Sequence, residues 1–315
     1  LEKQGAFYHP LRVKVLSKTG RSATFVLNGA VSRPGLALIE KEYQLLACLE
    51  KKAGAGFIPR VFGAKIQSFE IFNSEKNNAS DANSMEFNSD KKKVGFILGE
   101  WFEGFREFHI SNPDGEPKIA VWSSNGEVDY LSLDGAAIIY EQIAHILTTY
   151  YALDTGEQIF PWHHAAGDFV VDPMAKGLPV KLITVRGYAP LMEFDPDEIA
   201  PGDRILPSLL FFFLNLTLRA RLDREDGVGP LVFLGEGILQ ATVTGFLRGL
   251  ADKTDHALSS EMPGGVTNTR GLKKIFVNFM AGFSQEQIEM ALENLIDAWP
   301  MNASEGNLAG THLQA

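Results

Sequence analysis

The sequence is poor in the features that several classes of protein need. It has one cysteine in 315 residues, so no disulfide can form within the chain, and we expect the Cys48 thiol to be buried in a helix. No apolar run reaches the about 18 residues that a membrane span requires. Basic residues number 29 against 39 acidic ones, and the net charge of −10 argues against nucleic acid as the main partner. We therefore expect a cytoplasmic protein with neither a membrane nor a nucleic-acid partner.

Hydrophobic residues make up 45% of the chain, enough for a sizeable core in one large domain or two lobes. The N-terminal part is rich in predicted strands. Alternating apolar residues on either side of a Ser-Lys-Thr-Gly turn predict a hairpin, and apolar residues at helical spacing predict one helix after it. The expected strands are residues 11–16, 23–27, 65–71 and 94–98, and the expected helix is residues 36–52.

In two segments of this first half, the apolar residues show neither strand nor helix periodicity. Residues 73–93 are rich in Asn, Ser, Asp and Lys, and we expect a mobile loop between two strands. Residues 100–109 mix aromatic and charged side chains, which is typical of a connector between lobes. Its aromatic side chains either line a ligand pocket or pack at the junction, and both interpretations stay open.

The second half contains mostly helical patterns after one short hairpin. Ser284 and Gln287 have the spacing of a capping box, which predicts the start of the last helix. The expected hairpin joins residues 118–121 to 128–131, and the expected helices are residues 134–151, 208–224, 235–250, 269–281 and 285–299.

Residues 159–187 are the stretch most suggestive of chemistry. They read as a loop with His163, His164 and Asp168, then an apolar strand, a turn and a second apolar strand before Thr184. Titratable residues on a loop held by buried strands are typical of functional sites. Three interpretations of the histidines stay open: structural side chains bonded to loop carbonyls, a general base, or ligands of a transition metal together with Asp168.

The order of these elements and several local motifs resemble the protein-kinase-like fold, closest to the aminoglycoside and choline phosphotransferases. Glu42 resembles the helix glutamate of such small lobes, and Glu100-Trp101 resembles the hinge. His163 and Asp168 are five residues apart, like that family's catalytic aspartate and metal-binding asparagine. The resemblance implies ATP and Mg²⁺ as cofactors, with His163 as the candidate base and Asp168 as the candidate magnesium ligand.

This sequence departs from the family at positions that handle phosphate. Asn28 follows the strand on which the family carries a lysine, and Thr184 stands where it carries a magnesium-binding aspartate. Without a lysine partner, Glu42 is expected to be a solvated helix residue. No glycine-rich loop precedes Leu11, and whether residues upstream of Leu1 supply one stays open. The cofactor-binding candidates are Asn28, Glu42, Glu100, Trp101 and Thr184.

Two functions stay open. In the first, a degenerate kinase-like protein binds a nucleotide, a small ligand or a protein partner in the cleft between its lobes. In the second, an active ATP-dependent phosphotransferase acts on a small-molecule hydroxyl, with His163 as base and Asp168 holding Mg²⁺. Both predict that His163, Asp168 and Thr184 meet at the floor of that cleft. We favour the first because Asn28 and Thr184 replace two phosphate-handling residue types at once.

The sequence therefore predicts an α+β class and a bilobal protein-kinase-like fold, with a small antiparallel β lobe carrying one helix and a larger, mainly helical lobe. The expected divisions are a β-rich lobe at residues 1–99 including the mobile loop 73–93, a hinge at 100–110, a mainly helical lobe at 111–299 and a flexible tail at 300–315.

Overall fold

The structure, a computed structural model, describes residues 7–53, 56–73, 88–123, 126–160, 165–195, 200–256 and 271–298. The chain forms two compact units. Unit 1 comprises Leu1–Lys51 and Pro59–Phe102, and unit 2 comprises Lys52–Ile58 and Glu103–Ala315. The division between Phe102 and Glu103 falls within residues 100–110, where the sequence predicts a hinge. His163 and the predicted tail lie outside the described residues.

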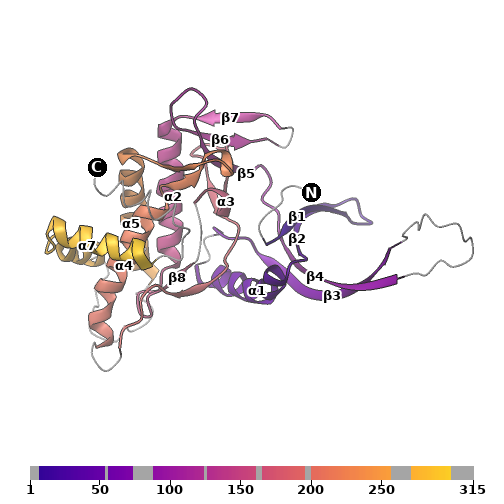
Figure 1. The fold of residues 1–315 in the computed structure, drawn as a ribbon, viewed down its shortest axis with the longest axis horizontal. Helices are drawn as coiled ribbons and strands as arrows, with labels where there is room; N and C mark the ends of the chain where they lie inside the picture. Colours follow the sequence, from indigo (N-terminus) through magenta and orange to yellow (C-terminus); the bar gives the residue numbers. More distant parts are fainter. Residues whose placement is uncertain are drawn as a thin grey trace, which may run out of the picture. The chain divides into compact units, whose positions relative to one another are not determined.

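Unit 1, as far as it is described, is an antiparallel sheet with one helix (Figure 1). The strands expected at residues 23–27 and 94–98 belong to one sheet, as the predicted small β lobe requires, and they pair directly, with Leu27 opposite Leu98. The sheet has the order β1-β2-β4-β3, and its elements are β1 (His9–Leu16), β2 (Ser22–Ala30), α1 (Arg33–Ala53), β3 (Val61–Asn73) and β4 (Asn88–Glu100).

The helix α1 packs on the sheet through a small apolar core. Buried Ile39 of α1 meets Ile97 of β4, together with Tyr8 and Ala30. Gly95 lies beneath the helix, where a Cβ atom would come 2.7 Å from Cγ1 of Ile39. The absence of a side chain at Gly95 therefore lets α1 approach the sheet closely. Cys48 is exposed on α1, so the expectation of a buried thiol was wrong.

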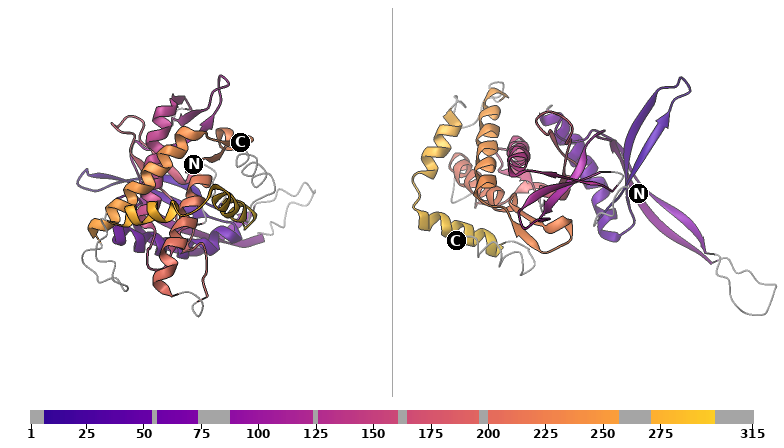
Figure 2. Two further views of the ribbon diagram at one scale, coloured as in Figure 1. Left: turned by 90° about the vertical axis from the view of Figure 1, so that its left-hand side faces the viewer. Right: turned by 90° about the horizontal axis from the view of Figure 1, so that it is seen from above.

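The prediction of a loop over residues 73–93 was partly wrong. Strand β3 continues to Asn73 and β4 begins at Asn88, with Ser68 opposite Lys93 and Asn73 opposite Asn88. The two strands extend as a ribbon beyond the rest of the sheet (Figures 1 and 2). Residues 88–93 read Asn-Ser-Asp-Lys-Lys-Lys, and a strand that pairs through its backbone needs no apolar residues for that pairing, which explains why the polar sequence concealed the start of β4. Residues 74–87 lie outside the described part of the chain.

Unit 2 combines helices with short sheets. In its described part, the largest sheet has the order β10-β9-β5-β6-β7, and two strand pairs, β11-β8 and β12-β13, accompany it. The elements are β5 (Arg106–Ser111), β6 (Lys118–Trp122), β7 (Val128–Leu131), α2 (Leu133–Tyr150), β8 (Glu157–Ile159), α3 (Ala165–Asp168), β9 (Phe169–Val171), β10 (Val180–Leu182), β11 (Tyr188–Pro190), η1 (Pro201–Arg204), α4 (Ile205–Arg219), β12 (Leu222–Arg224), η2 (Glu225–Gly227), β13 (Leu231–Phe233), α5 (Glu236–His256), α6 (Leu272–Met280) and α7 (Gln285–Ala298).

Helices α2 and α5 lie side by side and form the centre of unit 2 (Figure 1). Two glycines of α5 allow their close approach. A Cβ atom at Gly245 would overlap the carbonyl of Glu141, and one at Gly249 would lie 2.6 Å from Cβ of Thr148. On its other side α5 packs through Phe246, whose ring centroid is 5.1 Å from that of Phe276 in α6.

The described chain thus has an N-terminal antiparallel sheet and a C-terminal part rich in helices. Two expectations for this second part need correction. The predicted hinge contains strand β5, in which Phe108 and Ile110 are buried at alternate positions. The helix expected over residues 208–224 ends at Arg219, and β12 follows it. None of the helices in the described ranges is long and apolar enough to cross a membrane.

Candidate functional site

The site begins with the hairpin of β9 and β10, which the sequence predicts. Phe169 stands opposite Leu182. Along each strand, buried positions alternate with half-buried ones, as expected for a sheet covered on one face. Asp172 starts the turn, because its Oδ1 accepts hydrogen bonds from the backbone N–H groups of Met174 and Ala175 at 3.0 and 3.3 Å. The turn is therefore specified by local chemistry.

This hairpin brings Asp168 and Thr184 together, as the sequence predicts. The backbone N–H of Ile183 donates to the carbonyl of Asp168 at 2.9 Å, which continues the ladder by one step beyond Phe169 and Leu182. Asp168 and Thr184 therefore lie at the same end of the strand pair. Gly167, just before Asp168, has φ 89°, a left-handed conformation that favours glycine and turns the chain into β9.

The carboxylate of Asp168 is buried and already has partners. Only 4% of the residue is exposed. Its Oδ1 accepts a hydrogen bond from Oγ1 of Thr184 at 2.9 Å and lies 2.8 Å from Nη2 of Arg186. Its Oδ2 is buried and has no hydrogen-bond partner in the described ranges. We call Asp168, Thr184 and Arg186 the Asp168 cluster.

The charge of the Asp168 cluster is balanced within the protein, since the guanidinium of Arg186 neutralises the carboxylate. A magnesium ion prefers octahedral oxygen ligation and, in nucleotide sites, one or two carboxylates. Here the carboxylate of Asp168 shares one oxygen with a cation, and Thr184 contributes a hydroxyl in place of a second acid. Elsewhere in the described chain, no group of three His, Cys, Asp or Glu side chains could hold a metal ion. The residues present do not fit a magnesium–nucleotide site.

The other candidates from the sequence lie in unit 1. Glu42 is 2% exposed, so the expectation of a solvated helix residue was wrong. Asn28 is half-buried in β2 and stands opposite Ile97 of β4. Because Asn28 is part of the ladder, the expectation that β2 ends before it was also wrong, and the strand continues to Ala30.

Glu100 and Trp101 have contacts within unit 1. The carboxylate of Glu100 accepts hydrogen bonds from both the backbone N–H and the guanidinium of Arg60, at 3.2 and 3.3 Å. The guanidinium of Arg12 lies 5.1 Å from the centre of the Trp101 ring. These contacts join the end of β4 to the start of β3 and to β1. His163, the candidate base, lies outside the described residues.

A half-buried histidine in β5, His109, was missed at the sequence level. Nε2 of His109 lies 2.7 Å from Oε1 of Glu107, and Nδ1 lies 3.4 Å from Oδ2 of Asp223. Burial alone would lower the pKa of His109, but hydrogen bonds to Asp223 and Glu107 outweigh burial and raise it to about 9. The ring is therefore a cation at neutral pH. Asp223 is 114 residues away, a separation at which sequence offers no signal.

A second missed group joins α2 to α5. Nε2 of His145 lies 2.6 Å from Oδ2 of Asp252, and Arg248 lies near Glu141, with Nη1 3.6 Å from Oε1. The sequence did contain a signal for this group. The two polar residues of each helix are four positions apart, and this spacing places them on one face of the helix. Which two helices face each other is not visible from that spacing.

No family model matches this sequence, and no curated protein matches it at a significant level.

Proposed function

We propose that the chain is a degenerate kinase-like protein, similar to the aminoglycoside phosphotransferases, that binds a nucleotide, a small ligand or a protein partner without transferring a phosphoryl group. Two features support the kinase-like part of this proposal. In unit 1 a helix separates β2 from β3 in an antiparallel sheet. In unit 2 the hairpin of β9 and β10 carries Asp168 and Thr184 at one end.

The observation that carries the loss of phosphoryl transfer is the pairing of Arg186 with Asp168 at 2.8 Å. Phosphoryl transfer depends on cations that neutralise the phosphates, and acidic side chains hold the metal among them. In the Asp168 cluster the acidic side chain faces a cation of the protein, and Thr184 adds no charge. A metal ion would therefore have to displace Arg186 and would gain one carboxylate.

One observation favours active phosphoryl transfer as a second candidate. Oδ2 of Asp168 is buried without a hydrogen-bond partner among the described residues, and such an oxygen is costly unless something binds it. On this alternative Asp168 would hold Mg²⁺, which would neutralise phosphate charge, and the chain would phosphorylate a small-molecule hydroxyl with ATP.

Isothermal titration of the full chain with ATP, with and without Mg²⁺, distinguishes the two. We expect weak binding that Mg²⁺ changes by less than about twofold, and Asp168→Ala should leave it unaltered. Tight binding that requires Mg²⁺ and disappears in Asp168→Ala would establish the active alternative instead. A coupled assay for phosphoryl transfer from ATP makes the same comparison for turnover. On the active alternative, transfer is measurable in the unsubstituted chain and is lost in Asp168→Ala.

A gain-of-binding variant tests whether Arg186 and the lack of a second carboxylate weaken magnesium binding. Thr184→Asp combined with Arg186→Gln adds a second carboxylate and removes the competing cation. We expect Mg²⁺ to bind this double variant at least about tenfold more tightly than the unsubstituted chain. Thr184→Ser, which keeps the hydroxyl and the charge balance, is the matched control. An unchanged affinity for Mg²⁺ in the double variant would contradict the role assigned to Arg186.

A further inference from the structure

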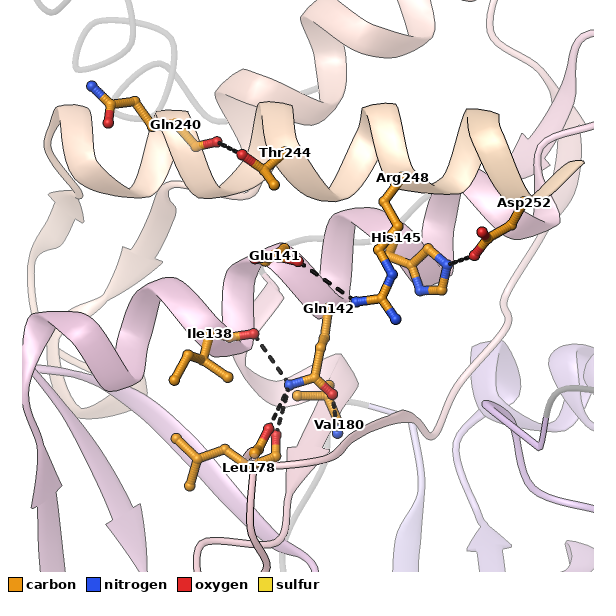
Figure 3. Close-up of polar contacts among 11 residues, drawn as sticks. Ile138, Glu141, Gln142, His145, Leu178, Val180, Gln240, Thr244, Arg248 and Asp252 are labelled. Atoms are coloured by element: carbon orange, nitrogen blue, oxygen red, sulfur yellow. Dashed lines mark hydrogen bonds and ion pairs between the residues drawn. The ribbon is translucent and has the colours of Figure 1, made fainter. Parts of the chain in front are cut away.

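A cavity of about 270 Å³ lies in unit 2 on the surface where α2 and α5 meet. It uses none of the residues of the Asp168 cluster. Its apolar lining comes from Phe57, Ile138 and Ile146, and its polar lining includes His145, Glu141 and Arg248. Figure 3 shows these polar side chains on neighbouring turns of the two helices. Small-molecule sites combine apolar walls with converging polar groups, and this cavity has both kinds of lining.

The walls of this cavity are held in place by the protein itself. Gln142 ties the β9–β10 turn to α2: its Nε2 donates to the carbonyls of Gly177 and Leu178 at 3.1 and 2.9 Å. Its Oε1 accepts from the backbone N–H of Val180 at 3.2 Å. On the other side, Gly245 fixes how closely α5 approaches α2. The cavity is therefore preformed, which reduces the entropy that a ligand must lose on binding.

His145 lines this space and has one ring nitrogen, Nδ1, that does not pair with Asp252. The other nitrogen, Nε2, lies 2.6 Å from Asp252, and the side chains of His145 and Asp252 are 8% and 54% exposed. Since a carboxylate accepts hydrogen bonds, Nε2 carries the proton in the neutral ring and Nδ1 offers a lone pair. Nδ1 has no partner within the described ranges, and it points away from Asp252 toward the side of the Arg248 guanidinium (Figure 3).

Arg248 provides the positive charge. Its pair with Glu141 is loose, at 3.6 Å, and the two side chains are 55% and 35% exposed. Such a pair contributes little to stability and leaves most of the five guanidinium N–H donors for another anion. A purely structural interpretation is that the His145–Asp252 and Glu141–Arg248 pairs only join α2 to α5. The contacts of Gly245 and Gly249 already dock α5 on α2, so helix packing does not require an imidazole beside a cavity.

We propose that this cavity binds a small aromatic carboxylic acid that carries a hydroxyl group. Its carboxylate pairs with the guanidinium of Arg248, its hydroxyl donates to Nδ1 of His145, and its ring lies against Phe57, Ile138 and Ile146. The volume of about 270 Å³ admits on the order of ten non-hydrogen atoms, the size of one substituted ring. Asp252 acts as a positioning residue that keeps the proton on Nε2 of His145.

The test uses the full chain and three probes in isothermal titration: meta-hydroxybenzoate, benzoate and phenol. Benzoate lacks the hydroxyl and phenol lacks the carboxylate. We expect meta-hydroxybenzoate to bind about tenfold more tightly than either. Arg248→Gln should weaken binding of both carboxylates about tenfold without changing phenol. Asp252→Asn should weaken the two hydroxyl compounds without changing benzoate.

Gln240→Ala is the matched control, because Gln240 lies on α5 away from the cavity (Figure 3). Arg248 and Asp252 are more than half exposed, so these variants are expected to fold, and their melting temperatures verify it. The proposal is overturned if meta-hydroxybenzoate does not bind saturably, if it binds no better than benzoate, or if Arg248→Gln and Gln240→Ala behave alike. None of these results depends on whether the chain binds ATP.

Discussion

Arg186 and Asp168 form an ion pair inside unit 2, with Nη2 2.8 Å from Oδ1 and side chains that are 18% and 6% exposed. Asp168 immediately precedes β9 and Arg186 follows β10, the two strands of one hairpin, and the pair places a cation of the protein beside the acid that the sequence suggests as a magnesium ligand. Stability, as well as metal affinity, should therefore depend on Arg186.

Arg186→Gln is expected to lower the free energy of unfolding by about 3 kcal/mol, because a buried carboxylate loses its counter-charge. Arg248→Gln is the matched control, since its pair with Glu141 is at 3.6 Å and largely exposed, and its loss should cost less than about 1 kcal/mol. Urea denaturation of the two variants measures both values. Equal losses would show that the Asp168 cluster does not depend on its arginine.

His109 should make stability depend on pH. Burial acts to lower the pKa of His109, but hydrogen bonds to Asp223 and, to a smaller extent, to Glu107 raise it from 6.5 to about 9 in the folded chain. The folded state therefore binds the proton more tightly than the unfolded state, and the stabilisation is complete below pH 6.5 and is lost as the pH rises through about 9.

The unfolding free energy of the unsubstituted chain should exceed that of His109→Gln at low pH. We expect this difference to shrink by about 3 kcal/mol between pH 6.5 and about pH 9. Denaturation at a series of pH values measures the difference, and NMR of the imidazole gives the pKa of His109 directly. A titration midpoint at or below the unperturbed 6.5 would contradict the role of the two carboxylates.

Two glycines on α5 should respond to alanine in opposite directions. At Gly245 a Cβ atom would overlap the carbonyl of Glu141, whereas at Gly237 nothing lies within 4 Å. Gly245→Ala is expected to cost about 2 kcal/mol or more, since α5 must move away from α2. Gly237→Ala should stabilise the chain by up to about 1 kcal/mol through helix propensity. Thermal unfolding separates the two, and a neutral Gly245→Ala would show that the helices pack less closely.

The start of α7 should depend on its capping box. Oγ of Ser284 accepts from the backbone N–H of Gln287 at 3.3 Å, and Oε1 of Gln287 accepts from the backbone N–H of Ser284 at 2.9 Å. Ser284→Ala is expected to cost about 1 kcal/mol because an N–H group at the helix start loses its acceptor. Gln285→Ala, which removes an exposed contact with Glu289, should cost a few tenths of that. Amide hydrogen exchange in α7 reports the difference locally.

The features that the sequence predicted well are local ones. The capping box at Ser284 and the hairpin of β9 and β10 follow from spacing, turn residues and apolar alternation over short stretches. That β2 and β4 share a sheet was expected from the resemblance to the kinase-like small lobe, because the two strands lie far apart in the chain. Strand β5 had the same kind of signal, with Phe108 and Ile110 buried at alternate positions. It was missed because the charged and aromatic residues around it resemble a connector.

The candidate site was predicted in part. That Asp168 and Thr184 would meet could be inferred, because antiparallel neighbours bring their ends together. That Arg186 would turn back to the carboxylate could not, since an arginine reaches any of several acids at similar distance along the chain. The burial of Glu42 was also unpredictable, because a helix that carries charge on several faces does not reveal which face covers a sheet.

The sequence by itself determined where most helices and strands form and which acid stands just before a buried strand, because periodicity, caps and turns act over a few residues. Only the tertiary structure decided which charges meet. Asp223 reaches His109 across 114 residues and Asp252 reaches His145 across 107, and these contacts depend on how whole elements pack. Packing is chosen by the summed burial of many side chains, so the partner of any one charged group is set by surfaces that lie far from it in the chain.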